Sequence, residues 1–294
     1  MKILLTGSSG FIGNNFLNYI NNNNHNILAI YNTKKPKLEK KNSNISFLKY
    51  DLKKKIPKKI IKFKPDVVFH LAWQGIPSFD FLNSELNLKN SYIFLKSLIE
   101  QANIKKLIIS GSCFEHYNLE HKEQFEKYKY FIYAKKNLYY LLKHICLEKK
   151  ISLGWFRIFF VYGKGQRKNS LIPYIIRSFK NRETLKILNI NDKNDYIHVD
   201  DVSNLFLIAI KKKFKSDIYD LGSGKLTSVH QILKIIKKKM SLDKFAIQTK
   251  KKNYKKISKK YLRANMIKVS KTFDWSTKLN IYEGIEKIIP SQKK

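Results

Sequence analysis

Short, continuous apolar runs alternate with amphipathic segments along the first 110 residues. The apolar runs predict buried strands, and the segments with a helical period predict helices between them. We expect strands at 3–5, 27–31, 46–50, 66–71 and 106–110, and helices at 14–20, before Pro65 and at 84–102. Strands that alternate with helices favour βαβ units and a parallel sheet whose strands are covered on both faces.

The pattern changes after residue 165. We expect helices at 170–179 and 201–210, and a strand at 218–221 that is followed by a second glycine-rich turn. No single period runs through 185–198, and the last 60 residues are rich in lysine and less regular. The pattern therefore predicts an α/β fold with a doubly wound parallel sheet in its first half.

The turn between the first predicted strand and the first helix carries Gly7, Gly10 and Gly13. Gly7 permits a tight turn, Gly10 lets the backbone approach a pyrophosphate, and Gly13 lets the helix pack closely on the strand. The N-terminus of the helix then offers N–H groups and partial positive charge to the phosphates. This context predicts a Rossmann-type dinucleotide site, formed by Gly7, Ser9, Gly10, Phe11, Ile12 and Gly13.

The end of the second predicted strand indicates which dinucleotide this site would bind. A carboxylate at the end of the second strand would bind the ribose 2′-OH of NAD, whereas a basic group favours the 2′-phosphate of NADP. This strand runs into Asn32, Thr33, Lys34 and Lys35, with no acidic residue. We therefore expect NADP to be favoured over NAD, with Asn32 and Lys34 beside the ribose.

The composition is strongly basic, with 59 Lys+Arg against 22 Asp+Glu and a net charge of +37. Only five of the basic residues are arginine, whose bidentate fork suits bases and phosphates, and the lysines are scattered. We interpret the excess as solvated lysine faces and expect no specific nucleic-acid partner. No apolar run approaches the roughly 20 residues of a membrane span. The two cysteines form no disulfide framework, so we expect a cytoplasmic protein.

Several segments, in order along the chain, resemble the extended short-chain dehydrogenase/reductase family, the NAD-dependent epimerase/dehydratases of nucleotide sugars. They are the Gly-x-x-Gly-x-x-Gly turn, Asp51-Leu52, His70-Leu71-Ala72-Trp73, Asn87, Ser110 to Glu115, Arg157 to Gly163, Asp195 to Val202 and Tyr219 to Gly224. The resemblance covers roughly residues 1–285. It implies that the cofactor site is completed by Asp51, Leu52, Leu71, Ala72, Trp73 and Asn87.

The resemblance also implies a reaction, the reversible oxidation of a sugar hydroxyl. In this family a tyrosine phenolate takes the hydroxyl proton while hydride passes to the nicotinamide. A lysine four residues later lowers the pKa of the phenol and binds the ribose, and a serine from the fifth strand binds the same hydroxyl. Ser112 fits the serine.

The Tyr-x-x-x-Lys pair is altered, and two registers are open. In the first register Lys135 is the family's lysine, and Phe131 stands at the tyrosine position without a hydroxyl. In the second register Tyr133 is the phenol, Asn137 lies four residues on, and Lys136 is within reach on the helix. We keep Ser112, Tyr133 and Lys135 as the expected catalytic residues, with Lys135 also binding the cofactor.

By the same resemblance, residues 1–165 form the dinucleotide-binding domain, to which 195–224 return, and 166–294 form mainly a smaller substrate lobe. Arg157, Gln166 and Arg167 are candidates for binding the substrate diphosphate, which suits arginine. Helices near 84–102 and 131–147 imply a homodimer. A metal site is not expected, because acidic residues after His198 are better explained as a helix cap, at Asp200 or Asp201.

The function implied is that of an NAD(P)-dependent epimerase, dehydratase or reductase of a nucleotide sugar, serving synthesis of a surface polysaccharide such as lipopolysaccharide. The alternative is a protein of the same fold that binds NAD(P) without turnover, as a sensor or scaffold, because the Tyr-x-x-x-Lys pair is degenerate. The sequence does not identify the sugar or the nucleotide.

Overall fold

The computed structural model describes residues 1–117, 122–241, 247–249 and 261–289. Within these residues the largest element is a seven-stranded sheet in the order β10-β6-β5-β4-β1-β2-β3, with parallel neighbours throughout. Its strands are β1 (Lys2–Thr6), β2 (Asn26–Tyr31), β3 (Ile45–Lys49), β4 (Val67–His70), β5 (Lys106–Ser112), β6 (Ser152–Ile158) and β10 (Asp217–Leu221). This confirms the predicted doubly wound α/β fold.

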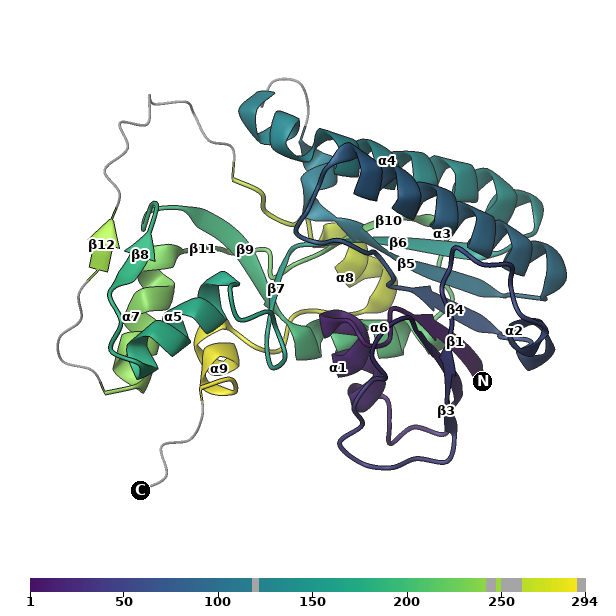
Figure 1. Ribbon diagram of the computed structural model, residues 1–294, viewed down its shortest axis with the longest axis horizontal. Coiled ribbons are helices and arrows are strands. Elements are labelled where there is room, and N and C mark those ends of the chain that lie inside the picture. The colour runs from purple at the N-terminus through teal and green to yellow at the C-terminus, as the bar shows by residue number, and fades with distance from the viewer. Residues whose placement is uncertain (118–121, 242–246, 250–260, 290–294) are drawn as a thin grey trace.

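Helices cover both faces of the sheet (Figure 1). One face carries α2 (Lys58–Phe63), α3 (Phe81–Gln101) and α4 (Lys122–Glu148), and the other carries α1 (Phe11–Tyr19), α6 (Val199–Lys211) and α8 (Ile267–Phe273). The sheet positions between them are fully buried, as at Leu4 and Val68 on one side and Leu5 and Phe69 on the other. The continuous apolar runs of the sequence thus reflect strands that are buried on both faces.

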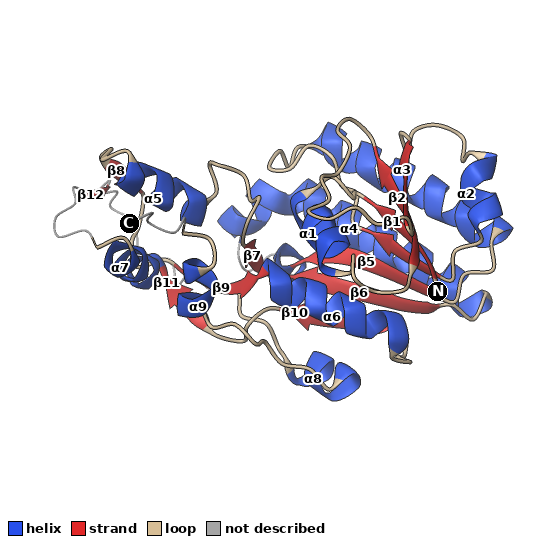
Figure 2. Cartoon of the chain, turned by 90° about the horizontal axis from the view of Figure 1, so that it is seen from below, coloured by secondary structure: helices blue, strands red, loops and turns tan. Residues whose placement is uncertain are grey.

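A smaller lobe lies beside the sheet domain (Figures 1 and 2). It contains β7 (Phe160–Tyr162), β9 (Lys193–His198) and β11 (Leu226–Ser228) in one sheet, and β8 (Leu185–Ile187) paired with β12 (Ile247–Thr249) in another. Its helices are α5 (Leu171–Lys180), α7 (Val229–Lys239) and α9 (Ile281–Glu286). They enclose a separate core with Ile175, Leu185, Ile232 and Ile285 at its centre.

The chain crosses between the two cores more than once. Residues 202–221 return to the large core, and so do Val269, Phe273 and Trp275, which come after the helix α7 of the smaller lobe. The cap of α6 also differs from the expectation. His198 is the N-cap residue, and its ring accepts the Asp200 N–H at 3.2 Å, whereas Asp200 and Asp201 lie in the first turn.

No helix among the described residues is long and apolar enough to cross a membrane. The same residues contain no cluster of His, Cys, Asp or Glu side chains arranged to hold a metal ion. Cys113 and Cys146 are both buried and unpaired.

Candidate functional site

The glycine turn after β1 is as tight as its sequence requires. Gly7 has a φ of +69°, and a Cβ built there would lie 2.6 Å from the Ala72 nitrogen. A Cβ at Gly13 would lie 2.2 Å from the Gly7 carbonyl oxygen. Ser8 fixes the turn to β2, because its hydroxyl donates to the Ile30 carbonyl at 2.7 Å. Gly7 and Gly13 therefore have structural roles that a larger residue could not fill.

Gly10 has a different role. It is the N-cap residue of α1 in an extended conformation, and a Cβ there would meet only the Gly7 oxygen, at 3.2 Å. No side chain caps the first turn of α1, which also contains no acidic residue. The N-terminal N–H groups of a helix have no partner within the helix and carry partial positive charge. Gly10 thus leaves room in front of a helix end that suits the linked phosphates of a dinucleotide.

A cavity of about 330 Å³ extends from this turn along the carboxyl ends of β1, β2 and β4. Seven of the expected cofactor residues outside the glycine turn line it: Asn32, Asp51, Leu52, Leu71, Ala72, Trp73 and Asn87. Gly7, Ser9 and Gly10 line it as well. Ile12 instead packs against the large core, so its role is to hold α1 in place. The cavity is of a size and polarity that fit the adenosine half of a dinucleotide, and we call it the cofactor cavity.

Two buried polar residues hold the edge of this cavity. The Asn87 side chain accepts the Gln74 N–H at 2.7 Å and donates to the Gln74 carbonyl at 3.0 Å, which fixes the loop after β4. His70 lies between the hydroxyls of Thr6 and Ser91, at 3.0 Å from each. Burial, with the nearby Lys135 charge, lowers the pKa of His70 to about 3, so the ring is neutral and structural.

A second cavity, of about 950 Å³, lies on the other side of the glycine turn. Phe11, Lys34, Lys35 and Lys37 line it, and the lobe adds Lys164, which pairs with Glu39 at 2.8 Å. The lysines after β2 are thus close to the glycine turn, where Ser9 and Gly10 line both cavities.

Lys135 is buried against Trp73, a residue of the cofactor cavity, but itself lines neither that cavity nor the two others. Its side chain projects from α4, donates to the Ser110 carbonyl at 2.6 Å and lies 3.9 Å from the centre of the Trp73 ring. Burial lowers the pKa of Lys135 to about 7, although the Glu115 carboxylate opposes this shift. Burial in turn raises the pKa of Glu115, which accepts the Ser112 N–H at 2.7 Å and the Trp155 indole N–H at 2.9 Å.

The two possible registers of the Tyr-x-x-x-Lys pair differ sharply in burial. Phe131 is 3% exposed and lines a third cavity together with Ser112. Tyr133 is 51% exposed, packs its ring on Phe125 and lines none of the three cavities. Two residues on a helix point about 200° apart, so Tyr133 and Lys135 cannot face the same site. The structure brings together Ser112, Phe131 and Lys135 and leaves Tyr133 outside.

The third cavity, of about 580 Å³, lies between the carboxyl edge of the sheet and the smaller lobe. Ser112 lines it at the end of β5, and its hydroxyl accepts the Phe114 N–H at 3.2 Å. Gln166 and Arg167 line it from the turn after β7, and Gln166 donates to the Val161 carbonyl at 2.9 Å. A cavity that joins the sheet edge to the lobe is suited to a substrate longer than a single sugar, and we call it the substrate cavity.

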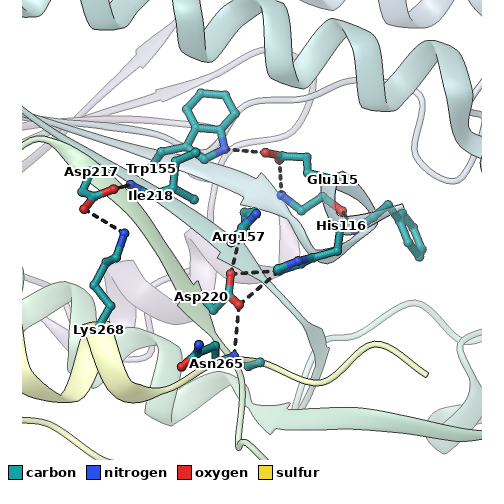
Figure 3. A network of polar contacts seen from close by, with 12 residues as sticks. Glu115, His116, Trp155, Arg157, Asp217, Ile218, Asp220, Asn265 and Lys268 are labelled. Atoms are coloured by element: carbon teal, nitrogen blue, oxygen red, sulfur yellow. Dashed lines mark hydrogen bonds and ion pairs between the residues drawn. The ribbon is translucent and has the colours of Figure 1, made fainter. Parts of the chain in front are cut away.

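Arg157, the third expected substrate residue, lines none of the three cavities. Its Nε donates to Asp220 at 2.8 Å, and Asp220 also accepts from the Asn265 N–H at 3.0 Å and lies 3.1 Å from the His116 ring (Figure 3). This network ties β6 to β10 and to the segment before α8. Arg157 thus has a buried partner within the fold, Asp220.

Sequence reasoning missed the buried carboxylates that support the site. Asp195 accepts N–H groups of Ser223, Gly224 and Ala264 at 2.6 to 3.0 Å, and so holds the second glycine-rich turn. Glu115 and Asp220 were quoted only as parts of motifs. Their signal was the rarity of acidic residues in this basic chain, where Asp195 lies in β9, Asp220 in β10 and Glu115 three residues after β5.

Comparisons with known proteins agree with this geometry. A model of the NAD dependent epimerase/dehydratase family matches residues 3–222. The chain is 24% identical over 305 residues to CDP-abequose synthase of Salmonella muenchen, covering 98% of this chain and 97% of the relative.

Two solved structures share the fold. One is a UDP-N-acetylglucosamine 4-epimerase of Methanobrevibacter ruminantium in complex with UDP-N-acetylmuramic acid, with a TM-score of 0.81, 20% identity, and coverage of 98% of this chain and 96% of that one. The other is a UDP-glucuronic acid 4-epimerase of Bacillus cereus in complex with UDP-glucuronic acid and NAD. Its TM-score is 0.78 at 19% identity, covering 98% of both chains.

Proposed function

Because the chain belongs to the NAD dependent epimerase/dehydratase family, we propose that it is an NAD(P)-dependent enzyme that oxidises or reduces a sugar carbon of a nucleotide sugar. The observation that carries the proposal is the continuity of the site. A glycine turn suited to phosphates lines the cofactor cavity together with Trp73, whose ring lies 3.9 Å from the Lys135 nitrogen, and Ser112 lines the neighbouring substrate cavity. The relatives named above, a CDP-abequose synthase and two 4-epimerases of UDP-linked sugars, support this substrate class. Such relatives also suit a role in surface polysaccharide synthesis.

Each part of the site has a proposed role. When bound, the nicotinamide supplies the acceptor or donor of hydride. Ser112 orients the reacting oxygen, and Lys135 holds its amino group against the Trp73 ring at the edge of the cofactor cavity. Gln166 and Arg167 bind the diphosphate of the substrate, where the arginine fork is suited to phosphate oxygens. Tyr133 and Arg157 have no role in the proposed chemistry.

The cofactor is proposed to be NADP rather than NAD. Asn32 lines the cofactor cavity, and Lys34 and Lys35 follow it in sequence without an intervening carboxylate. We expect calorimetric titration to give a lower Kd for NADP+ than for NAD+ by about tenfold, and the double variant Lys34→Ala/Lys35→Ala to remove this difference by weakening NADP+ alone. Equal affinities for the two dinucleotides in the unaltered protein would contradict the preference.

A homodimer is also proposed, through the outer surfaces of α3 and α4. Ile93 on α3 and Tyr140, Leu141 and Leu147 on α4 are each more than 40% exposed. Apolar side chains gathered on neighbouring helices are typical of an interface. The unpaired cysteines and the nucleotide-sugar substrate make the cytoplasm the proposed location.

Phe131 favours a second candidate function, cofactor binding without turnover. In the register that the burial of Lys135 supports, no phenol stands four residues before the lysine. A panel of nucleotide sugars incubated with NADP+ and NADPH, with products identified by nuclear magnetic resonance, separates the two candidates. Conversion of at least one sugar supports the enzyme. Tight cofactor binding with no conversion across the panel would favour the second candidate.

A further inference from the structure

The substrate cavity has a lobe side, which we call the polar half although Leu171, Ile172 and Leu188 also line it, and a sheet-edge side, which we call the apolar half. Polar side chains come from the turn after β7 and from the lobe, and they are Gln166, Arg167, Lys186, Asn189, Asp192 and Asn194. The side of the sheet edge is formed by Ile76, Phe79, Ser112, Cys113, Phe114 and Phe131. Among the described residues of the sheet-edge side, Ser112 carries the only hydroxyl, whereas Tyr162, Ser170, Tyr174 and Tyr196 line other parts of the cavity.

Aromatic rings form a continuous wall in the apolar half, which we call the ring wall and define as Phe79, Phe114, Phe131 and Phe160. The ring centres of Phe79 and Phe131 lie 5.0 Å apart, those of Phe79 and Phe114 5.9 Å, and those of Phe114 and Phe160 6.0 Å. Phe114 is joined to Ser112, whose hydroxyl accepts its N–H. The ring wall therefore begins directly at the hydroxyl that is proposed to hold the reacting oxygen.

This division orients a nucleotide sugar in the cavity. The charged diphosphate belongs in the polar half, beside Arg167, so the sugar reaches the sheet edge with the carbons far from its anomeric bond. C4 lies across the ring from C1, and the exocyclic C6 is attached next to C4 through C5. With the reacting oxygen of C4 at Ser112, the C6 substituent lies against the ring wall.

Resting on the proposed function, we propose that the substrate is a nucleotide-linked 6-deoxyhexose, whose methyl group packs on the ring wall. A methyl group gains contact with the rings and needs no partner. A 6-hydroxyl in the same place would lose its water against phenyl rings, which carry no acceptor or donor. A hydrophobic pocket rejects an added hydroxyl by up to about 100-fold, so a preference of about tenfold to 100-fold is expected.

Matched pairs of sugars test this preference directly. The Kd values of glucose and 6-deoxyglucose carried on UDP, dTDP, CDP and GDP are measured by calorimetry with the protein saturated with NADP+. On the nucleotide that binds best, we expect the 6-deoxy sugar to bind at least tenfold more tightly. Equal binding, or tighter binding of glucose, would overturn this inference and leave the proposed function standing. If no nucleotide sugar binds to the cofactor-loaded protein, the proposed function falls and the inference falls with it.

A pair of variants ties the preference to the ring wall. Phe79→Asn places a polar group in the wall, and we expect the preference to fall below threefold. Phe81→Asn is the matched control, because Phe81 is 58% exposed at the start of α3 and lines none of the three cavities. Thermal melting checks that both variants fold. A preference that persists in Phe79→Asn, at an unchanged melting temperature, would contradict the role given to the ring wall.

Discussion

Lys135 has an ammonium group buried between a backbone carbonyl and an indole ring. An exposed lysine has a pKa of about 10.4, whereas burial lowers that of Lys135 to about 7. Between these values the unfolded chain binds the proton and the folded protein does not, so stability rises with pH in this window. The cost of burying Lys135 is therefore full at and below about pH 7 and fades toward pH 10.

The expected result is a pH-dependent gap between the unaltered protein and Lys135→Met. We expect the free energy of unfolding of the unaltered protein, relative to the variant, to rise by about 1–3 kcal/mol between pH 7 and pH 9. Loss of the lysine also leaves Glu115 without its nearby positive charge. Urea unfolding at several pH values measures it. A gap that does not vary with pH would show that Lys135 titrates as an exposed lysine.

Substitutions at Phe131 and Tyr133 are expected to have different effects on turnover. Phe131→Tyr places a phenol on the wall of the substrate cavity, four residues before Lys135, and positioned acid–base groups contribute about 100-fold or more. We expect kcat for the best nucleotide sugar to rise at least tenfold in this variant. Tyr133→Phe should change kcat less than twofold, because that side chain points to solvent. A large loss of turnover in Tyr133→Phe would instead make Tyr133 the phenol of the reaction.

For single residues, the sequence predicted which residue types belong to the site better than it predicted where their side chains lie. The positions of the glycines and of the residues that line the cofactor cavity could be predicted, because the local strand–turn–helix context fixes the backbone there. The two registers stayed open because Phe131 and Tyr133 both precede Lys135, and only the burial of α4 separates them. Arg157 sits in a motif that resembles the family, but its partner Asp220 lies 63 residues away.

Elements of the sheet are tied together by the network around Asp220 (Figure 3). Burial raises the pKa of Asp220, but His116, Arg157 and the Asn265 N–H together hold it below its usual range. The lowered pKa means that the stabilisation is present above about pH 4 and is lost as the pH falls through the folded-state pKa. Removing one partner of a buried ion pair leaves an uncompensated charge.

We therefore expect Asp220→Asn to lower the free energy of unfolding by about 3 kcal/mol at pH 7. Asp217→Asn is the matched control on the same strand, because the Asp217–Lys268 pair is about half exposed and such pairs contribute about 0–1 kcal/mol. Urea denaturation of both variants gives the comparison. Equal losses in the two variants would contradict the importance of burial for this network.

The elements that the sequence missed have identifiable causes. The strand β6 contains Gly154 and Arg157, and these interrupt its apolar run. The helix α7 ends in three lysines, and its buried residues are Ile232, Leu233 and Ile236. The general excess of lysine made their helical period hard to recognise in the sequence. Its capping box, in which Ser228 and Gln231 bond each other's backbone N–H groups, was a usable start signal. Local patterns predicted the sheet domain well because its runs are buried on both faces.

The whole molecule is a sheet domain with a smaller lobe beside it (Figure 1). The proposed substrate cavity is lined by residues of both. The proposed cofactor and substrate residues come from segments that are distant in sequence but meet at the carboxyl edge of one parallel sheet, as in other open α/β folds. The return of residues 202–221 and 266–275 to the large core joins the lobe to the sheet domain. The account therefore depends on the glycine turn, because the cofactor must bind there for the rest of the site to act.

Calorimetric titration of NADP+ into the unaltered protein and into Gly10→Val tests that claim most directly. A valine fits the extended conformation of Gly10, but its side chain fills the space in front of α1. We predict saturable binding to the unaltered protein, a Kd at least 100-fold higher in Gly10→Val, and melting temperatures within a few degrees of each other. The absence of binding to folded, unaltered protein, or an unchanged Kd in Gly10→Val, would contradict the account.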